Sequence, residues 1–420
     1  MSTIWIINQY ASTPATGVGG RHHHLARELA ARGHRVYLIA AQWHHLLRDG
    51  GASEGAPLAE RVEGYDFVRL PTPRYSHAHD RKRVLNWVLF AWRLASLRRR
   101  IPDPPDVIMC SSPSLFAVMG AERLARRFGA RLVFEVRDIW PQTLVEVGGL
   151  SPRNPMIQVM QRIEDRAYRQ ADGVISNLPG AVDHMVSRGM DRHKFSWIPN
   201  GFSAADVERP TRLGADARAR IPTGKFIVGY AGTLGVANAL DTFLDAAERL
   251  QAQEEIAFVL LGHGKEKAAL EASAARRKLT NVHFLPAVPK DQVQSVLEFF
   301  DVCSIGLRAE SLFRFGVSPN KLFDYLIAGK PIIYGIDSGT YRPVEEFQAG
   351  IQIPPQNVEA LVEAILKLRA LQPAERRRMG ENGRRAALEH HEYGMLARRL
   401  EEVLLGGATG NDRVGLREAS

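Results

Sequence analysis

Cysteine and long apolar runs are both scarce in this 420-residue chain. Its two cysteines, Cys110 and Cys303, lie far apart, which argues against a disulfide framework or a zinc site and favours a reducing, cytoplasmic location. The longest strongly apolar segment, residues 84–92, is about half of the roughly 20 residues that span a bilayer, so we expect no transmembrane helix. The first residues have a short apolar run and no basic stretch before it, so no signal peptide is predicted either.

The remaining composition is that of a globular protein with an excess of positive charge. With 45% hydrophobic and 24% charged residues, the chain is neither disordered nor collagen-like, and its length suits two or three domains. The formal net charge of +9 favours an anionic partner, such as a phosphate ligand, an acidic lipid or a nucleic acid. The net charge alone does not show which of these is the partner.

Short apolar runs alternate with amphipathic stretches of helix length, which is typical of βαβ units. The first half has expected strands at residues 4–8, 35–40, 107–110, 132–136, 173–176 and 195–198. The second half has them at residues 226–230, 257–261, 282–285, 302–306, 331–334 and 351–353. The pattern predicts an α/β protein with two doubly wound parallel sheets, divided near residue 205. Ligands of such sheets bind beyond the carboxyl ends of the strands, so the functional residues should lie there.

A glycine loop, Gly17 to Gly20, follows the first expected strand and begins a helix. Free backbone N–H groups at a helix N-terminus attract phosphate, although such a loop can also be a tight turn that packs a helix on a sheet. The three histidines that follow, His22 to His24, point in different directions on a helix, so a metal site is not expected.

Charged residues also follow the strand at 132–136, where packing gives them no reason to lie. Glu135, Arg137 and Asp138 lie at its carboxyl end. A carboxylate beside an arginine can act as a base, as an orienting group, or as half of a structural ion pair, and the sequence leaves these alternatives open.

In the second half, Gly232, Gly262 and Gly264 follow successive strands, where a pyrophosphate could approach the backbone. A helix then begins with Ser318 as its expected N-cap, and Lys321 falls in its first turn. A lysine there opposes the helix dipole, which indicates a bound anion unless the side chain reaches solvent. Asp324, one turn later, could accept hydrogen bonds from ribose hydroxyls.

Several strings in this order resemble one known family over nearly the whole chain. They are the Gly17–Gly20 loop, Arg137-Asp-Ile-Trp-Pro, Ile198-Pro-Asn-Gly, Gly262-His-Gly-Lys-Glu, Asn281-Val-His-Phe-Leu-Pro-Ala-Val-Pro, Ser318-Pro-Asn-Lys-Leu-Phe-Asp and Ala328-Gly-Lys-Pro. The sequence resembles glycosyltransferase family 4 with the GT-B fold, particularly bacterial O-antigen and capsule enzymes that include N-acetylfucosamine transferases. The resemblance implies two Rossmann-like domains facing a central cleft: 1–204 for the acceptor and 205–385 for the nucleotide sugar. A helix at 386–405 would pack back toward the first domain, and 406–420 would be a loose tail.

The chain departs from the family pattern at three places. The family has two glutamates before its Gly-Lys-Pro string; the second matches Asp324, but the first falls on Gly316. Its Arg and Lys at the donor diphosphate correspond to Thr233 and Asn238, which leaves that charge to Lys321, Arg314 and backbone N–H groups. A histidine common after the fifth strand is replaced by Arg137-Asp138.

The resemblance implies a retaining glycosyltransferase of lipopolysaccharide or other cell-surface polysaccharide synthesis. The expected donor is a nucleotide sugar, specifically a UDP-linked N-acetylated deoxysugar, and the expected acceptor is a saccharide on a polyprenyl diphosphate lipid. The expected catalytic residues are Asp138, which would receive the acceptor proton, Arg137, and Lys321, which would stabilise the leaving diphosphate. The expected donor site comprises Gly232, Thr233, Gly262, Gly264, Arg314, Ser318, Asn320, Lys321 and Asp324, and Gly17, Gly19 and Gly20 would form a phosphate loop on the acceptor side. No cofactor and no metal ion are expected.

Two alternatives remain open at this point. A nucleotide-sugar 2-epimerase would share the fold and turn over the donor without an acceptor. A basic nucleic-acid-binding protein would explain the charge, but the sequence has no helix-turn-helix, RNP-like strand or zinc pattern, so no nucleic-acid partner is expected.

The segment 81–100 predicts peripheral attachment to the inner face of the cell membrane. It places Trp87, Phe90 and Trp92 between two basic clusters, the second being Arg98 to Arg100. Interfacial aromatic residues and cations favour an anionic lipid surface. The alternative is a helix packed on the sheet with solvated ends.

Overall fold

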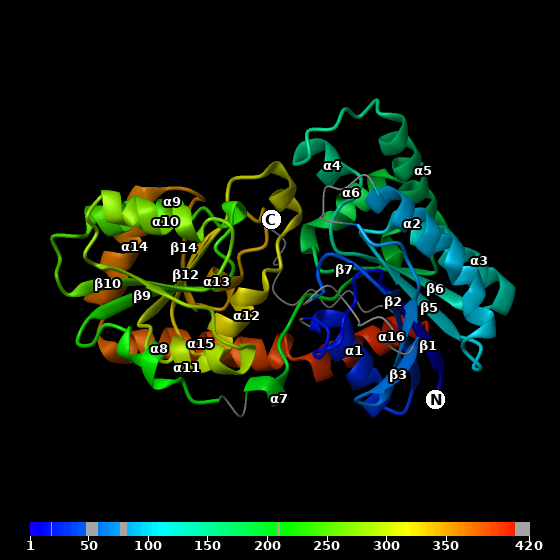
Figure 1. The fold of residues 1–420 in the computed structure, drawn as a ribbon, viewed down its shortest axis with the longest axis horizontal. Helices are drawn as coiled ribbons and strands as arrows, with labels where there is room; N and C mark the ends of the chain where they lie inside the picture. The colour runs from blue at the N-terminus through cyan, green and yellow to red at the C-terminus, as the bar shows by residue number, and fades with distance from the viewer. Residues whose placement is uncertain (18, 48–57, 76–81, 208–210, 408–420) are drawn as a thin grey trace. The chain divides into compact units, whose positions relative to one another are not determined.

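The computed structural model describes residues 1–17, 19–47, 58–75, 82–207 and 211–407. These residues form two compact units, the first built from residues 1–200 with 393–407 and the second from residues 201–392. Figure 1 gives the element labels used below. Each unit is a parallel sheet covered by helices on both faces, as the alternation of apolar runs and amphipathic stretches predicts.

The sheet of the first unit has the strand order β3-β4-β2-β1-β5-β6-β7-β8. Its strands are β1 (Thr3–Ile7), β2 (Arg35–Ala41), β3 (Ala59–Val62), β4 (Tyr65–Leu70), β5 (Val107–Ser111), β6 (Arg131–Val136), β7 (Gly173–Ser176) and β8 (Phe195–Trp197). All neighbours pair in parallel except β3 with β4. The strand order reverses between β1 and β5, which is where a sheet of this kind opens a crevice for ligands.

Alternating side chains of β1 bind helices to the two faces of this sheet. Ile4 and Ile6 share a core with residues of α1 and α16, whereas Trp5 packs edge-on against Phe128 of α3. The helices of this unit are α1 (Gly20–Ala31), α2 (Lys82–Arg93), α3 (Leu115–Phe128), α4 (Gln142–Glu146), α5 (Pro155–Gln170), α6 (Val182–Ser187) and α16 (Tyr393–Leu404), with short 3-10 turns at Leu94–Arg99, Pro179–Ala181 and Arg192–Lys194.

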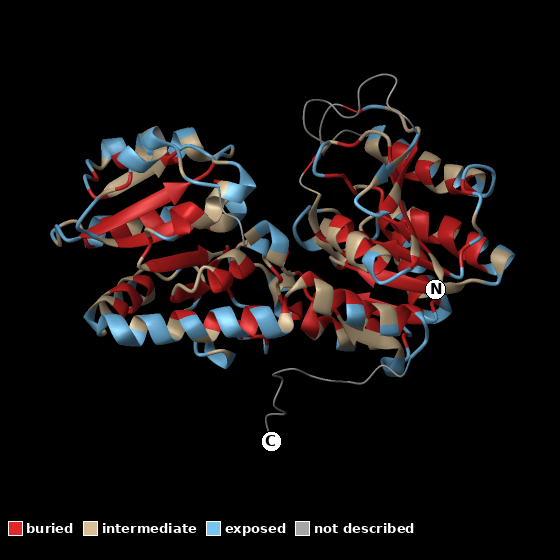
Figure 2. Ribbon diagram, turned by 90° about the horizontal axis from the view of Figure 1, so that it is seen from below, coloured by how far each residue is buried: buried red, intermediate tan, exposed pale blue. Residues whose placement is uncertain are grey.

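The sheet of the second unit has the order β11-β10-β9-β12-β13-β14 and is parallel throughout. Its strands are β9 (Phe226–Ala231), β10 (Ile256–Leu261), β11 (Val282–Leu285), β12 (Val302–Gly306), β13 (Ile332–Gly335) and β14 (Gly350–Gln352). The strand order reverses between β9 and β12. Figure 2 shows the central strands of both sheets as buried, which explains their continuous apolar runs.

Helices cover both faces of this second sheet as well. One core contains residues of α9, α10 and α14, and the other contains residues of α11, α12 and α15. The helices are α7 (Ala204–Val207), α8 (Ala215–Ala219), α9 (Leu240–Arg249), α10 (Lys267–Arg276), α11 (Val293–Leu297), α12 (Asn320–Ile327), α13 (Pro343–Glu346), α14 (Val358–Ala370) and α15 (Pro373–His390), with 3-10 turns at Val236–Asn238, Lys290–Gln292 and Ser311–Phe315.

The division between the units falls at 200/201 rather than at the expected 204/205. The amide of Phe202 donates a hydrogen bond of 3.0 Å to the carbonyl of His391, and Phe202 also forms a β-bridge with Glu392. These contacts bind residue 202 to the second unit.

The expected helix at 386–405 is two helices. α15 continues to His390, and α16 begins at Tyr393 after a break. α16 packs against α1 in the first unit through Leu396, Leu400 and other apolar residues. The predicted tail, 406–420, lies outside the described residues from 408 onward.

Candidate active site

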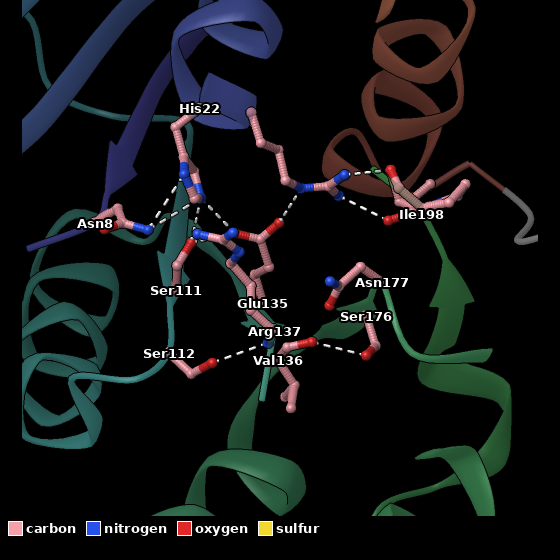
Figure 3. Close-up of polar contacts among 12 residues, drawn as sticks. Asn8, His22, Ser111, Ser112, Glu135, Val136, Arg137, Ser176, Asn177 and Ile198 are labelled. Atoms are coloured by element: carbon pink, nitrogen blue, oxygen red, sulfur yellow. Dashed lines mark hydrogen bonds and ion pairs between the residues drawn. The ribbon is translucent and has the colours of Figure 1, made fainter. Parts of the chain in front are cut away.

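The carboxyl ends of β1, β5, β6 and β7 bring polar residues of the first unit together at the reversal of its strand order (Figure 3). Glu135, on β6, is the centre of this group and is completely buried. Its carboxylate accepts hydrogen bonds from Arg21 Nε at 2.8 Å, from His22 Nε2 at 2.6 Å, and from the hydroxyl of Ser111. With three donors on its carboxylate, the buried Glu135 holds these neighbouring side chains in place.

The protonation states of this cluster follow from burial and charge. Burial alone would raise the pKa of Glu135, but the contacts with His22 and the charge of Arg21 outweigh it and hold the pKa well below its usual range. Burial lowers the pKa of His22, and this effect exceeds the opposite effect of the charge and hydrogen bond of Glu135. A neutral His22 can donate from Nε2 to Glu135 and accept at Nδ1 from the Asn8 amide, 3.2 Å away.

Arg21 and His22 form the first turn of α1, directly after the glycine loop. The guanidinium of Arg21 also donates to the carbonyls of Ile198, at 2.8 Å, and Pro199. These bonds fix the start of α1 to the carboxyl edge of the sheet. They explain why Arg21 occupies a helix N-terminus, where the dipole opposes its charge.

The glycine loop itself requires glycine at two of its expected phosphate-binding positions. Gly19 and Gly20 both have φ near +71°, and α1 begins at Gly20. A side chain at Gly17 would collide with Ser12, because an added Cβ would lie 2.4 Å from its hydroxyl oxygen. Ser12 Oγ in turn accepts a hydrogen bond from the Gly19 amide.

Arg137 and Asp138 lie just beyond β6 but do not form an ion pair with each other. Among the residues that the structure describes, no carboxylate lies within 4.0 Å of the Arg137 guanidinium. Asp138 is an exposed residue. Desolvation of its carboxyl group by the surrounding protein raises the pKa of Asp138, and the charge of Arg137 opposes this rise. The ion-pair alternative therefore has no contact to support it.

In the second unit, Lys321 lies in the first turn of α12 and reaches toward the end of β9. Its Nζ donates to the Tyr230 hydroxyl oxygen at 3.0 Å and to the Asn238 side-chain oxygen. Within the described ranges no carboxylate pairs with it, and burial lowers its pKa to about 8. An ammonium has three N–H donors, so one remains for an anion.

The glycines near Lys321 allow two loops to touch. A Cβ on Gly262 would lie 1.9 Å from the carbonyl oxygen of Gly232, and one on Gly264 would lie 2.1 Å from that of Leu234. A Cβ on Gly232 would come within 3.1 Å of the Lys321 stem. The loops after β9 and β10 therefore pack backbone to backbone beside the lysine, which only glycine permits.

The other expected donor-site residues are less closely grouped. The Thr233 carbonyl accepts from the Tyr230 hydroxyl, at 2.7 Å, and from the Asn238 amide. Asp324 does not share partners with Lys321, since both its oxygens lie within 2.6 Å of Lys290 Nζ. Any ribose hydroxyl at Asp324 would therefore meet Lys290 as well.

The start of α12 differs from the expectation. The helix begins at Asn320 with Pro319 as its N-cap, because Pro319 has an extended backbone, so Ser318 is not the cap and is instead buried. Asn320 is exposed. Arg314, also exposed, lies over the Phe315 ring and donates a hydrogen bond to the carbonyl of Ser311.

The sequence of each unit matches a family model. Residues 16–201 match the glycosyl transferase 4-like domain, and residues 215–386 match the glycosyl transferases group 1 domain. The chain is a glycosyltransferase with the GT-B fold. The two matches together support membership of glycosyltransferase family 4, the family that the sequence motifs of this chain resemble.

Named relatives and solved structures agree with this assignment. The transferase is 27% identical over 367 residues to the putative colanic acid biosynthesis glycosyl transferase WcaI of Escherichia coli strain K12, covering 84% of this chain and 89% of the relative. It shares its fold with sucrose-phosphate synthase from Thermosynechococcus elongatus, with a TM-score of 0.73, 18% identity and coverage of 97% and 99% of the two chains. Anabaena HepE in complex with UDP-glucose has the same fold, with a TM-score of 0.66, 15% identity and coverage of 97% and 100%.

Sequence reasoning did not identify several contacts of the transferase. Glu135 was expected among the charges at the end of its strand but was given no role, and neither His22 nor the contact of Tyr230 with Lys321 was expected. His22, His23 and His24 do diverge as a helix requires: His22 contacts Glu135, His23 contacts Tyr65, and His24 stacks on Tyr393. The described part of the chain contains no group of three or more His, Cys, Asp or Glu side chains placed to hold a metal ion.

The segment expected at a membrane surface is largely packed in the protein. Trp87 and Phe90 of α2 are buried, and Trp87 donates to the Tyr10 hydroxyl and packs edge-on against Trp140. The expectation that both face lipid is wrong. Arg81 lies outside the described residues.

A different face of α2 is apolar and exposed. Leu85, Val88 and Trp92 are 54%, 45% and 72% exposed, and their spacing places them along one stripe of the helix. Arg98 to Arg100, beyond its end, are exposed as well. Of the helices in the described ranges, none has the length and hydropathy needed to span a bilayer.

Proposed function

We propose that this glycosyltransferase moves a sugar from a UDP-sugar to a lipid-linked saccharide, with retention of the anomeric configuration, in the synthesis of a cell-surface polysaccharide. The name of the WcaI relative supports the polysaccharide, and the UDP-glucose in the HepE structure supports the donor class. An N-acetylated deoxysugar is the proposed sugar, on the motif resemblance stated above.

The environment of Lys321 carries this proposal. The lysine has no carboxylate partner among the described residues and keeps one N–H donor beyond those used by Tyr230 and Asn238. It lies at the N-terminus of α12, beside loops whose backbones a diphosphate can approach. A preorganised cation in such a site stabilises the charge that develops on a leaving diphosphate.

Asp138 is the proposed proton acceptor of the sugar transfer. Asp138 is an exposed residue at the carboxyl edge of the first sheet, and no ion pair within the described residues engages it. A base must reach the acceptor hydroxyl within hydrogen-bond distance, and a carboxylate that no ion pair holds can do so. The glycine loop at the start of α1 is the proposed phosphate loop on this side.

The stripe of Leu85, Val88 and Trp92 supports attachment to the cytoplasmic face of the cell membrane. A narrow apolar face with cations at its end suits an anionic lipid surface better than a buried interface. A lipid-linked acceptor would be held at that same surface.

A thermal-shift screen of nucleotide sugars tests the donor proposal. A ligand that binds only the folded state stabilises it by about 2.7 kcal/mol at 100 times its Kd. We expect UDP-sugars to raise the midpoint temperature of thermal unfolding of the wild type and to have little effect on that of Lys321→Ala. Equal stabilisation of both proteins, or none by any nucleotide sugar, would contradict the proposal.

A further inference from the structure

The helices α2, α3 and α5 form one layer on the first sheet (Figure 1). α3 contacts the sheet through Phe128 and α5 through Tyr168, so the layer covers the face opposite α1 and α16. α2 packs closely on α3, because a Cβ on Gly120 would lie only 2.8 Å from the carbonyl oxygen of Ala91. The three helices therefore present one continuous outer surface.

This layer contains the charge excess of the chain. Its segments have 12 Lys and Arg residues but three Asp and Glu residues, a difference equal to the net charge of +9 of the whole chain: 82–100, 115–128 and 155–170. Burial raises the pKa of Glu164, one of the three acids, to about 8, so this residue adds no negative charge at neutral pH. On the opposite face, α1 and α16 have four arginines and three glutamates, so the excess belongs to the layer.

Each helix of the layer has apolar residues near its start and arginines toward its end on the outer side. At helical spacing, the outer residues in chain order are Leu85, Val88 and Trp92 on α2, with Arg98 to Arg100 beyond it; Phe116, Met119, Arg123 and Arg127 on α3; and Val159, Arg162, Arg166 and Arg169 on α5. The apolar residues of α2 and α5 are exposed, those of α3 are half-buried, and all these arginines are exposed.

The three helices run in the same direction, so their halves form two bands. α2 leads into β5, α3 into β6 and α5 into β7, and each helix thus ends near the amino end of the next parallel strand. The apolar band therefore lies toward the carboxyl edge of the sheet, and the arginine band lies toward its amino edge.

An apolar band beside a cationic band fits the surface of an anionic bilayer. Among the residues that the structure describes, Arg123, Arg127 and Arg162 form no ion pair, so their charges are available to lipid phosphates. Exposed apolar side chains reach the boundary between headgroups and acyl chains. A nucleic acid would bind the arginines but leave the apolar band in water, and a second copy of the layer would bring arginine against arginine.

We propose that the whole layer of α2, α3 and α5, and not α2 alone, lies on the anionic membrane surface. The apolar band enters the acyl boundary, and the arginine band binds lipid phosphates. This inference rests on the proposed function and deepens it, because it fixes the orientation of the first unit. The carboxyl edge of the sheet, with Asp138, then lies at the level of the headgroups, where the diphosphate of a lipid-linked acceptor is held.

Vesicle flotation of the full-length protein tests the arginine band. The triple replacement of Arg123, Arg127 and Arg162 by Ser should weaken binding to vesicles of phosphatidylcholine and phosphatidylglycerol by about 100-fold, since each cation at such a surface adds to the affinity. Vesicles of phosphatidylcholine alone should bind the wild type and this variant equally weakly. The matched control removes the same charge from exposed arginines outside the layer, by replacing with Ser the residues Arg377, Arg384 and Arg398.

A fluorescent label tests the orientation and does not depend on the triple variant. Both native cysteines are buried, so an added surface cysteine takes the label. On anionic vesicles with brominated acyl chains, the label on Val159→Cys, in the apolar band, should be quenched more than that on Gln170→Cys, at the other end of α5. Glu402→Cys is the control, because this exposed residue belongs to α16 on the opposite face, where the label should not be quenched.

Each outcome supports or overturns the proposal. Equal loss of vesicle binding in the two triple variants would overturn it as an effect of net charge, and equal quenching at positions 159 and 402 would overturn the orientation. A layer variant that loses affinity for duplex DNA but not for vesicles would assign the layer to nucleic acid instead. If the wild type does not float with anionic vesicles, the proposed membrane attachment itself fails, whereas a floating protein whose layer variant matches the control contradicts this inference alone.

Discussion

The ammonium of Lys321 lies 3.0 Å from the hydroxyl oxygen of Tyr230, which donates its own proton to the Thr233 carbonyl. This arrangement orients the lysine from β9 and leaves one N–H for a ligand. A neutral hydroxyl and an amide position a cation without neutralising it, so its charge remains available to a diphosphate.

Lys321→Ala should weaken donor binding and lower turnover together. The cation would contact the diphosphate both in the bound donor and in the transition state, so we expect kcat/KM to fall by about 100-fold. Steady-state kinetics of both variants and the wild type measure this. Lys367 is an exposed lysine of the same unit, on α14, so Lys367→Ala serves as the control for the change in net charge. Unchanged kinetics in Lys321→Ala would remove this lysine from the donor site.

Donor affinity should fall as the pH rises through about 8. Burial lowers the pKa of Lys321 to about 8 in the free protein, so the charged form is present below that pH and is lost above it. UDP is already fully ionised there, since phosphate has a second pKa near 6. Calorimetry of UDP from pH 7 to pH 9.5 should show the loss in the wild type and a much flatter profile in Lys321→Arg, whose guanidinium stays charged. Equal profiles in the two proteins would contradict this role.

Asp138→Asn should lower turnover and leave UDP affinity and thermal stability nearly unchanged. The amide keeps the size of the side chain but cannot accept the proton, so we expect a loss of about 10²–10⁴-fold in kcat. Asp183→Asn is the matched control, because that side chain is 79% exposed in the same unit. A loss of stability with unchanged specific activity would instead make Asp138 a structural residue.

The main strands could be predicted from sequence because buried parallel strands are continuous apolar runs. The β3–β4 pair could not. β3 reads Ala-Glu-Arg-Val and alternates exposed with half-buried residues, and the end of β4 contains Arg69, which is buried and forms an ion pair with Glu60. A charged residue at a buried position of a strand interrupts the apolar pattern from which the strand would be predicted.

The site could be predicted only in part, for a similar reason. Lys321 and the glycines carry local signals, namely a helix start and strand ends. The contact of His22 with Glu135 joins residues 113 apart, and the contact of Lys321 with Tyr230 joins residues 91 apart. Such contacts depend on which strands become neighbours, and a single sequence does not state this.

Glu135→Gln should destabilise the first unit by about 3 kcal/mol at neutral pH, because it leaves the buried Arg21 without its anion. The pKa of Glu135 is lower folded than unfolded, so its stabilising effect is full above about 4.5 and is lost as the pH falls below that value. Thermal unfolding should therefore show a gap between wild type and variant at pH 7 that narrows below pH 4.5. A gap that stays constant with pH would show that the charge of Glu135 is not responsible.

Trp92→Ser and the triple replacement of Arg98, Arg99 and Arg100 by Ser should each reduce flotation with anionic vesicles. The first removes the largest exposed apolar side chain of the α2 stripe, and the second removes cations worth about 1 kcal/mol each at such a surface. Leu388→Ser, which alters an exposed apolar residue of the second unit, should float as the wild type does. Equal recovery from neutral and anionic vesicles would contradict attachment.

Transfer of labelled sugar from UDP-sugars into a bacterial lipid extract tests the central claim most directly. The account predicts that label enters the lipid fraction with one UDP released per sugar transferred, that the new linkage keeps the anomeric configuration of the donor, and that Lys321→Ala and Asp138→Asn both lose the signal. Conversion of the nucleotide sugar to its 2-epimer without any acceptor, or transfer that persists in both variants, would contradict it.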